Sequence, residues 1–241
     1  MQLNIHNYVS YNGIDLLKKG HLLVGVLAAF APAIVMSALI LTETTPFYIK
    51  HVSSFYCMLG MLAAVLHPLY FVNRDYSSKA ISLINNSKQN RKNYVMANVV
   101  IALYVSLLYV VLGIGLLLVT KQLGVPGELE VSFLLGFSAN FFLLVLTYFL
   151  FGYLLFLYGI RSGAIYLILT VMLLFIPNIL SNILYSTNNS FLSGLIENFP
   201  GYFYPALVGS NPLSLLQYSI GCVILLVLFL LVFNKSKKIE M

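Results

Sequence analysis

VSFLLGFSANFFLLVLTYFLFGYLLFLYGI, residues 131–160, is a run of 30 residues without a single Asp, Glu, Lys or Arg. A helix needs roughly 20 predominantly apolar residues to cross the hydrocarbon core of a bilayer. A helix also satisfies its own backbone hydrogen bonds, which hydrocarbon cannot do for it. The run therefore predicts a membrane-spanning helix that is long enough to tilt or to extend beyond the core.

Five further runs of spanning length also lack Asp, Glu, Lys and Arg. They cover residues 22–41, 55–72, 99–119, 165–184 and 215–233. Hydrophobic residues make up 60% of the 241 residues and charged residues 8%, against about 45–50% and about 25% in a soluble domain. The sequence therefore predicts an all-α polytopic membrane protein with six transmembrane helices.

The six spans form a single domain over residues 1–241. It comprises a lead at 1–21, a six-span body at 22–234 and a tail at 235–241. The first run is longer than the 7–15 apolar residues of a signal peptide, so we expect it to be retained as a span.

The basic residues predict how the chain is oriented in the membrane. Eleven of the 13 Lys and Arg residues lie in segments that six spans place on one side. These are Lys18, Lys19, Arg74, Lys79, Lys88, Arg91, Lys92, Arg161, Lys235, Lys237 and Lys238. Only Lys50 and Lys121 fall on the other side. Because basic loops stay in the cytoplasm, both termini and the loop between spans two and three are predicted to be cytoplasmic.

Two segments outside the spans have the pattern of short surface helices. Ile5, Tyr8 and Val9 share a helical face in the lead, which predicts an amphipathic interfacial helix, with a frayed tail as the alternative. Between spans five and six, NNSFLSGLIENFPGYFYP (188–205) has helical apolar spacing followed by aromatic residues. Aromatic side chains favour the headgroup level, so an outer re-entrant helix is expected before span six.

The sequence contains no motif of a common membrane enzyme. It has neither a P-loop (G-x-x-x-x-G-K-[ST]) nor H-E-x-x-H, so ATP binding through a P-loop of its own is not expected. The six runs contain no carboxylate, whereas proton- and sodium-coupled transporters usually need one at membrane depth. Cys57 and Cys222 both lie in runs and are expected to pack as small apolar residues. We therefore expect no catalytic residue, metal site or cofactor in this chain, and no nucleic-acid partner.

A few polar residues do lie at membrane depth. They are His67, Asn140, Asn178 and Asn182. Such groups face protein or water rather than lipid. Each could therefore bond a neighbouring helix or line a substrate cavity, and both interpretations remain open.

The longest polar stretch separates spans two and three. It runs from Asn73 to Tyr94 and makes up most of the segment RDYSSKAISLINNSKQNRKNYVMAN, residues 74–98. Asp75 or Ser77 could cap a short helix there. Its apolar residues are Tyr76, Ala80, Ile81, Leu83 and Ile84. Such a helix could rest on the membrane or sit in a groove of a cytoplasmic partner.

This segment resembles the one that links the second and third spans in permeases of the ABC-2 type. The matching features are the polar start at Arg74-Asp75-Tyr76, the Leu83-Ile84 centre and the basic exit from Gln89 to Lys92. Six spans, internal termini and an amphipathic lead agree with that family along the whole chain. Ser77-Ser78-Lys79 departs from the Gly-Thr that is frequent there.

The resemblance implies the permease subunit of an ATP-driven exporter. In that family the segment is a coupling helix, which would make Tyr76, Ala80, Ile81, Leu83 and Ile84 the ATPase-coupling residues. Two permease subunits, as a homo- or heterodimer, would pair with two ATPase subunits that bind ATP and Mg. This chain would itself be no enzyme.

The composition is similar to that of Gram-positive cell-membrane permeases that export amphipathic or antimicrobial peptides of the phenol-soluble modulin type. Membrane lipid and an amphipathic peptide would be the other partners. The alternatives are a bacteriocin self-immunity permease or a lipid-exporting ABC permease. A membrane-embedded enzyme or a sensor subunit is the alternative of another class.

Overall fold

A computed structural model describes residues 3–43, 45–78, 80–84 and 86–237, without the side chain of Leu83, and this part of the chain contains helices and no strand. The prediction of six helices able to cross a bilayer is confirmed. They are His21–Thr42 (α2), Ile49–Ser77 (α3), Lys88–Gln122 (α5), Val131–Leu157 (α6), Ser162–Ser186 (α7, η1 and α8) and Leu215–Lys237 (α11). The shorter helices are Ile5–Lys18 (α1), Ala80–Ile84 (α4), Ser190–Glu197 (α9) and Pro200–Leu207 (α10).

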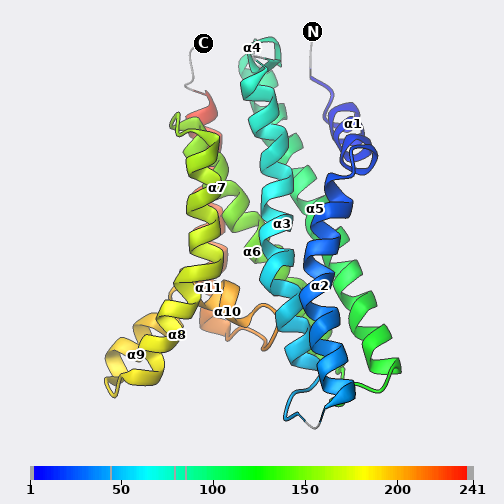
Figure 1. Cartoon of the computed structure of the whole chain (residues 1–241). Coiled ribbons are helices and arrows are strands. Elements are labelled where there is room, and N and C mark those ends of the chain that lie inside the picture. Colours follow the sequence, from blue (N-terminus) through cyan, green and yellow to red (C-terminus); the bar gives the residue numbers. More distant parts are fainter. Residues whose placement is uncertain (1–2, 44, 79, 85, 238–241) are drawn as a thin grey trace.

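The spans run side by side, with the short helices at their ends (Figure 1). One end carries α1, α4 and the C-terminal end of α11, and the opposite end carries α9 and α10. The segments that hold most of the basic residues therefore gather at one end of the molecule. The cytoplasmic assignment of this end stays a prediction.

Close helix contacts at small residues build the centre of the bundle. α6 is the most enclosed span. In its most apolar stretch 67% of the residues are buried, against 17% in that of α11. Gly113 of α5 lies so near α3 and α6 that a Cβ atom there would come within 2.7 Å of the Tyr56 ring and 2.9 Å of the Phe137 ring. The Tyr56 hydroxyl donates a hydrogen bond to the Tyr109 carbonyl oxygen at 2.6 Å. Small residues at such crossings let helices approach closely in a membrane.

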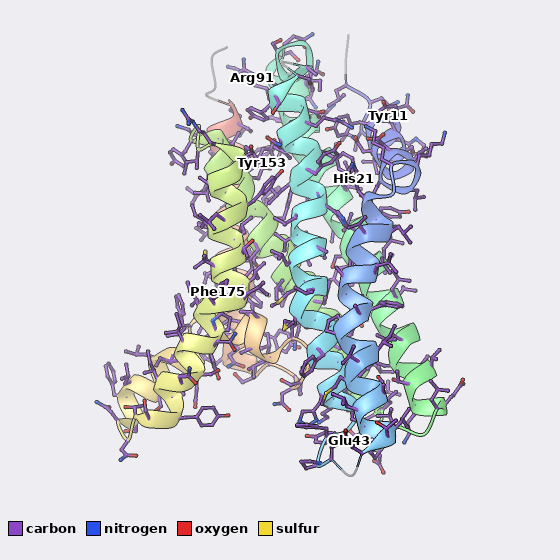
Figure 2. The ribbon with its side chains drawn as sticks, in the orientation of Figure 1. Tyr11, His21, Glu43, Arg91, Tyr153 and Phe175 are labelled. Carbon is purple, nitrogen blue, oxygen red and sulfur yellow. The ribbon has the colours of Figure 1, made fainter. Side chains whose placement is uncertain are left out.

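α1 crosses the direction of α2 and lies against the body (Figure 1). Gly20, at φ 72°, allows the turn because this backbone region is open to glycine. Tyr8 and Val9, from the predicted apolar face, pack against the core, and Leu16 is fully buried. The apolar row that remains exposed is a different one: Tyr11, Ile14 and Leu17. Tyr11 lies at the outer side of α1 (Figure 2).

The fifth span is interrupted. α7 (Ser162–Thr170) continues through a π-helical segment, η1 (Val171–Phe175), into α8 (Ile176–Ser186), whose second residue is Pro177. Proline lacks the N–H that would bond one turn back, and π-segments relieve such a disruption inside a helix. Beyond it, α8 and α9 diverge from the bundle, and α10 returns toward it (Figure 1). Two short helices thus occupy the region where the sequence predicts a re-entrant helix.

The predicted orientation can be tested at two exposed residues, Ser77 at the α4 end and Asn188 between α8 and α9. With Cys57 and Cys222 replaced by Ala, we expect Asn188→Cys to react with a membrane-impermeant thiol reagent added to intact cells. Ser77→Cys is expected to react only after the cells are opened, because basic residues hold this end of α3 inside. Labelling of both from outside would contradict the orientation.

Candidate functional site

The α4 end is built by the two longest helices. α3 has 29 residues and α5 has 35, so at 1.5 Å per residue they measure about 44 and 52 Å. The hydrocarbon core is only about 30 Å thick. Both helices therefore extend beyond the core, and they carry α4 between them at the end of the molecule (Figure 1).

A cluster of charged groups lies where α3 leaves the predicted span. The Arg74 guanidinium contacts the Asp75 carboxylate at 2.9 Å and the Asp15 carboxylate of α1 at 3.0 Å. It also donates a hydrogen bond to the Asn12 side-chain oxygen at 2.8 Å. Lys19 forms a more exposed ion pair with Asp15 at 3.2 Å. Buried charges need partners of this kind, because removal from water otherwise costs several kcal/mol.

Asp75 is the centre of this cluster. The residue is only 3% exposed, and its carboxylate accepts hydrogen bonds from the hydroxyls of Tyr8 in α1 and Tyr94 in α5, the latter at 3.1 Å. Burial, together with the neighbouring Asp75, raises the pKa of Tyr8, so the Tyr8 hydroxyl stays protonated and donates. The sequence predicted that Asp75 or Ser77 caps a short helix, which is wrong because both residues lie inside α3. Asp75 instead ties together α1, α3 and α5.

Further bonds fasten the chain ends to the start of α5. The Leu3 N–H donates to the Asn90 side-chain oxygen at 2.7 Å, and the Asn93 amide donates to the Leu3 carbonyl oxygen at 2.9 Å. Arg91 donates to the Lys237 carbonyl oxygen at the end of α11, at 3.0 Å. Arg91, one of the basic residues before span three, therefore binds another part of this chain and helps to hold the end of α11 in place.

The predicted coupling residues are turned mainly toward the body. Ile81 is 6% exposed. Tyr76 stacks on Phe156 of α6 with ring centroids 6.3 Å apart, and Ala80 and Ile84 are half-buried. The side chain of Leu83 lies outside the described part of the chain. Among the described side chains of residues 76–87, the exposed ones are all polar: Ser77, Ser78, Ser82, Asn86 and Ser87. Ile81, one of the expected coupling residues, thus packs against the body, and the coupling role of the set stays a prediction.

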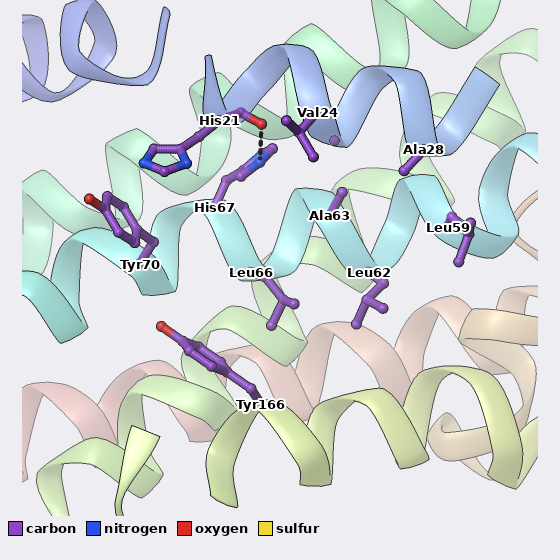
Figure 3. Close-up of a pocket in the computed structure, with 11 residues that line it drawn as sticks. His21, Val24, Ala28, Leu59, Leu62, Ala63, Leu66, His67, Tyr70 and Tyr166 are labelled. Carbon is purple, nitrogen blue, oxygen red and sulfur yellow. Dashed lines mark hydrogen bonds between the residues drawn. The ribbon is translucent and has the colours of Figure 1, made fainter. Parts of the chain in front are cut away.

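A lateral pocket of about 410 Å³ lies between α2, α3 and α7 (Figure 3). Most of its wall is aliphatic. The residues lining it are His21, Val24, Gly25, Ala28, Leu59, Leu62, Ala63, Leu66, His67, Tyr70 and Tyr166. Its polar side chains gather toward the end of the pocket where α2 begins, and Leu59 lies at the other end (Figure 3). The pocket is therefore apolar along its length and polar at one end.

His67 joins three helices at the wall of this pocket. Its Nε2 lies 3.0 Å from the His21 carbonyl oxygen of α2, and its Nδ1 lies 3.4 Å from the Tyr109 hydroxyl of α5. A carbonyl oxygen can only accept, so Nε2 carries the proton and Nδ1 accepts from Tyr109. Both ring nitrogens are then engaged by the protein, and this geometry supports the interhelical interpretation of His67 over the proton relay.

The three asparagines predicted as cavity residues lie in different environments. Asn140 is 1% exposed, donates to the Asn211 carbonyl oxygen at 3.1 Å and accepts from the Tyr218 hydroxyl at 2.7 Å. It links α6 to α11. Asn178 donates to the Leu174 carbonyl oxygen and lines a smaller pocket of about 290 Å³ between α3, η1, α8 and α10. Asn182 is exposed on α8. The structure thus separates these residues rather than gathering them.

The comparisons with known proteins add no relative. No family model matches the chain, and no curated protein does. Within the described residues, His, Cys, Asp and Glu form no group of three or more that could hold a metal ion.

Proposed function

We propose that this chain is the membrane-spanning permease subunit of an ATP-driven exporter, working as one of a pair with separate ATPase subunits. The observation that carries the proposal is the protruding α3–α4–α5 hairpin. It presents a short helix at the end that holds most of the basic residues, outside the hydrocarbon and within reach of a soluble partner. The resemblance of residues 74–98 to the coupling segment of ABC-2 permeases gives this hairpin its proposed role.

The hairpin is suited to transmit a displacement. Ile81 fixes α4 against the body, and Arg74 and Asp75 join α3 to α1 and α5 through buried ion pairs and hydrogen bonds. Packed interiors are stiff and have discrete arrangements rather than continuous ones. A push on α4 would therefore move α3 and α5 as rods, and both helices pack against α6, the most enclosed span.

The size of the pockets supports a transport path between two copies of the chain. A helix with side chains is about 10 Å across and rises about 5.4 Å per turn, so one turn fills about 420 Å³. The pocket of Figure 3, at about 410 Å³, and the groove between α2 and α5, at about 600 Å³, each hold less than two turns. An amphipathic peptide of several turns needs a larger space, which two permease subunits facing each other could provide.

The test is copurification of the ATPase with variants of the outward α4 surface. Ser82 is exposed at the middle of α4, and a Trp there would not fit an interface packed to the density of a protein interior. We expect Ser82→Trp to reduce copurified ATPase about tenfold, the equivalent of losing about 1.4 kcal/mol. Peptide-stimulated ATP hydrolysis should fall with it.

Two controls isolate docking. Ser10→Trp places the same side chain on the exposed surface of α1, and Ser82→Ala removes the hydroxyl without adding bulk; both should retain the ATPase. Ile84→Asp would be a poorer probe, because Ile84 packs partly against the core. Equal retention by both Trp variants would exclude docking at α4. Failure of any ATPase to copurify with the unaltered chain would overturn the permease proposal.

A further inference from the structure

We infer that the pocket of Figure 3 holds one acyl chain of an anionic membrane phospholipid, with the lipid phosphate at the end where α2 begins. This binding site is independent of the proposed transport function. It rests on the shape of the pocket, on the order of its polar and apolar residues, and on the charges around its polar end.

The pocket is elongated along α3. Its α3 residues recur every three or four positions from Leu59 to Tyr70, which keeps them on one face of the helix. Eleven residues of helix rise about 16 Å, close to half of the roughly 30 Å hydrocarbon core. The pocket therefore has the length of one leaflet, which is the depth that an acyl chain occupies.

The width of the occupant follows from the volume. At about 410 Å³, the pocket lies within the range of small-molecule sites, about 300–1,000 Å³. One turn of helix would fill it entirely, so a peptide helix running the length of α3 does not fit. A single hydrocarbon chain does fit, and Leu62 and Leu66 from α3 face the space it would fill (Figure 3).

The polar end matches an anionic headgroup. The hydroxyl ends of Tyr70 and Tyr166 and the imidazole of His21 lie on the side where α2 begins (Figure 3), and the His21 and Tyr70 rings contact each other with centroids 4.7 Å apart. Lys18 and Lys19 come just before His21, and Arg161 comes just before α7. The nearby carboxylates of Asp15 and Asp75 are balanced by Arg74 and Lys19, with which they form ion pairs. Lys18 and Arg161 then give this region a net positive charge.

The experiment uses the purified chain without any ATPase, so its outcome does not depend on the proposed function. The chain is placed in nanodiscs of phosphatidylcholine and phosphatidylglycerol with a trace of phosphatidylglycerol that carries a diazirine in its acyl chain. After photolysis, labelled peptides are mapped by mass spectrometry. We expect labelling concentrated on 59–66 of α3 and 24–28 of α2.

Two matched substitutions decide whether the label reports this pocket. Ala63→Phe fills the pocket, whereas Ala38→Phe adds the same ring to a mostly apolar groove between α2 and α5, which no acidic or basic residue lines. Labelling at 59–66 should fall about tenfold in Ala63→Phe, the equivalent of about 1.4 kcal/mol of binding, and persist in Ala38→Phe. Ala28→Leu, which fills less space, is the second pocket variant if Ala63→Phe does not fold. Equal labelling in all variants would overturn the site.

The headgroup is tested separately. The same diazirine chain on phosphatidylcholine should label 59–66 more weakly than on phosphatidylglycerol, and Lys18→Gln should remove that difference. Equal labelling by both lipids in the unaltered chain would overturn the anionic headgroup. Loss of the label on adding an amphipathic helical peptide, with lipid composition unchanged, would show that the occupant is peptide and would overturn the lipid assignment.

Discussion

Replacing Arg74 by Gln is expected to destabilise the protein by about 3–5 kcal/mol, the cost of leaving a buried charge without its partner. Asp75 is 3% exposed and would keep only the hydroxyls of Tyr8 and Tyr94. Asp15 would lose its contact at 3.0 Å as well. The measurement is the free energy of unfolding in detergent micelles, with exposure of α1 to protease as a local readout.

The control lies in the same cluster. Lys19 pairs with Asp15 from a side chain that is 49% exposed, and exposed ion pairs contribute roughly 0–1 kcal/mol. Lys19→Gln should therefore change stability by less than about 1 kcal/mol. The double variant Arg74→Gln/Asp75→Asn should recover part of the loss, because no buried Asp75 charge remains and the tyrosine hydroxyls can donate to the amide oxygen. The account would be contradicted if the loss of stability in the double variant equalled the sum of the losses in Arg74→Gln and Asp75→Asn made singly.

Adding one methyl group at Gly113 is expected to cost about 1–3 kcal/mol, the usual effect of overpacking a close-packed interior. The new Cβ would lie 2.7 Å from the ring of Tyr56 and 2.9 Å from that of Phe137. The Tyr56 ring cannot give way easily, because its hydroxyl is fixed to the Tyr109 carbonyl oxygen. Gly113→Ala would therefore push α3 and α6 away from α5.

Gly115 provides a matched comparison two residues further along the same helix. A Cβ atom there has nothing within 4 Å, so Gly115→Ala should cause no loss of stability. The two variants share the same change in backbone entropy. The difference between their unfolding free energies therefore reports only the close helix contact at Gly113. Equal unfolding free energies for Gly113→Ala and Gly115→Ala would show that the helices accommodate the methyl group.

The spans were predictable from the sequence because hydropathy is a property of each segment alone. The runs at 22–41 and 131–160 are apolar enough to require a bilayer wherever their neighbours lie. Hydropathy does not show where a helix ends, because a helix can continue beyond its apolar run. α3 continues through polar residues to Ser77. For that reason the sequence placed Asp75 in a loop, whereas the structure places it in a buried helical position.

The site residues depended on neighbours that periodicity cannot identify. Ile81 lies in an apolar cluster that could face a partner or the body, and only the packing of α3 against α5 turns it inward. Asn140 and His67 are equally polar at membrane depth. Both bond other helices or loops, unlike Asn178. Tyr218 and Asn211 approach Asn140, and Tyr109 approaches His67, from distant parts of the chain.

The attachment of α1 also dictates an order of events during synthesis. Its anchors are Arg74 and Asp75 at the end of α3, and Asn90 and Tyr94 at the start of α5. The first pair of partners is made at the end of the second span, and the other pair only at the start of the third. The attachment of α1 can therefore begin at α3 but be completed only once α5 has been made, so α1 closes over a body that is translated after it.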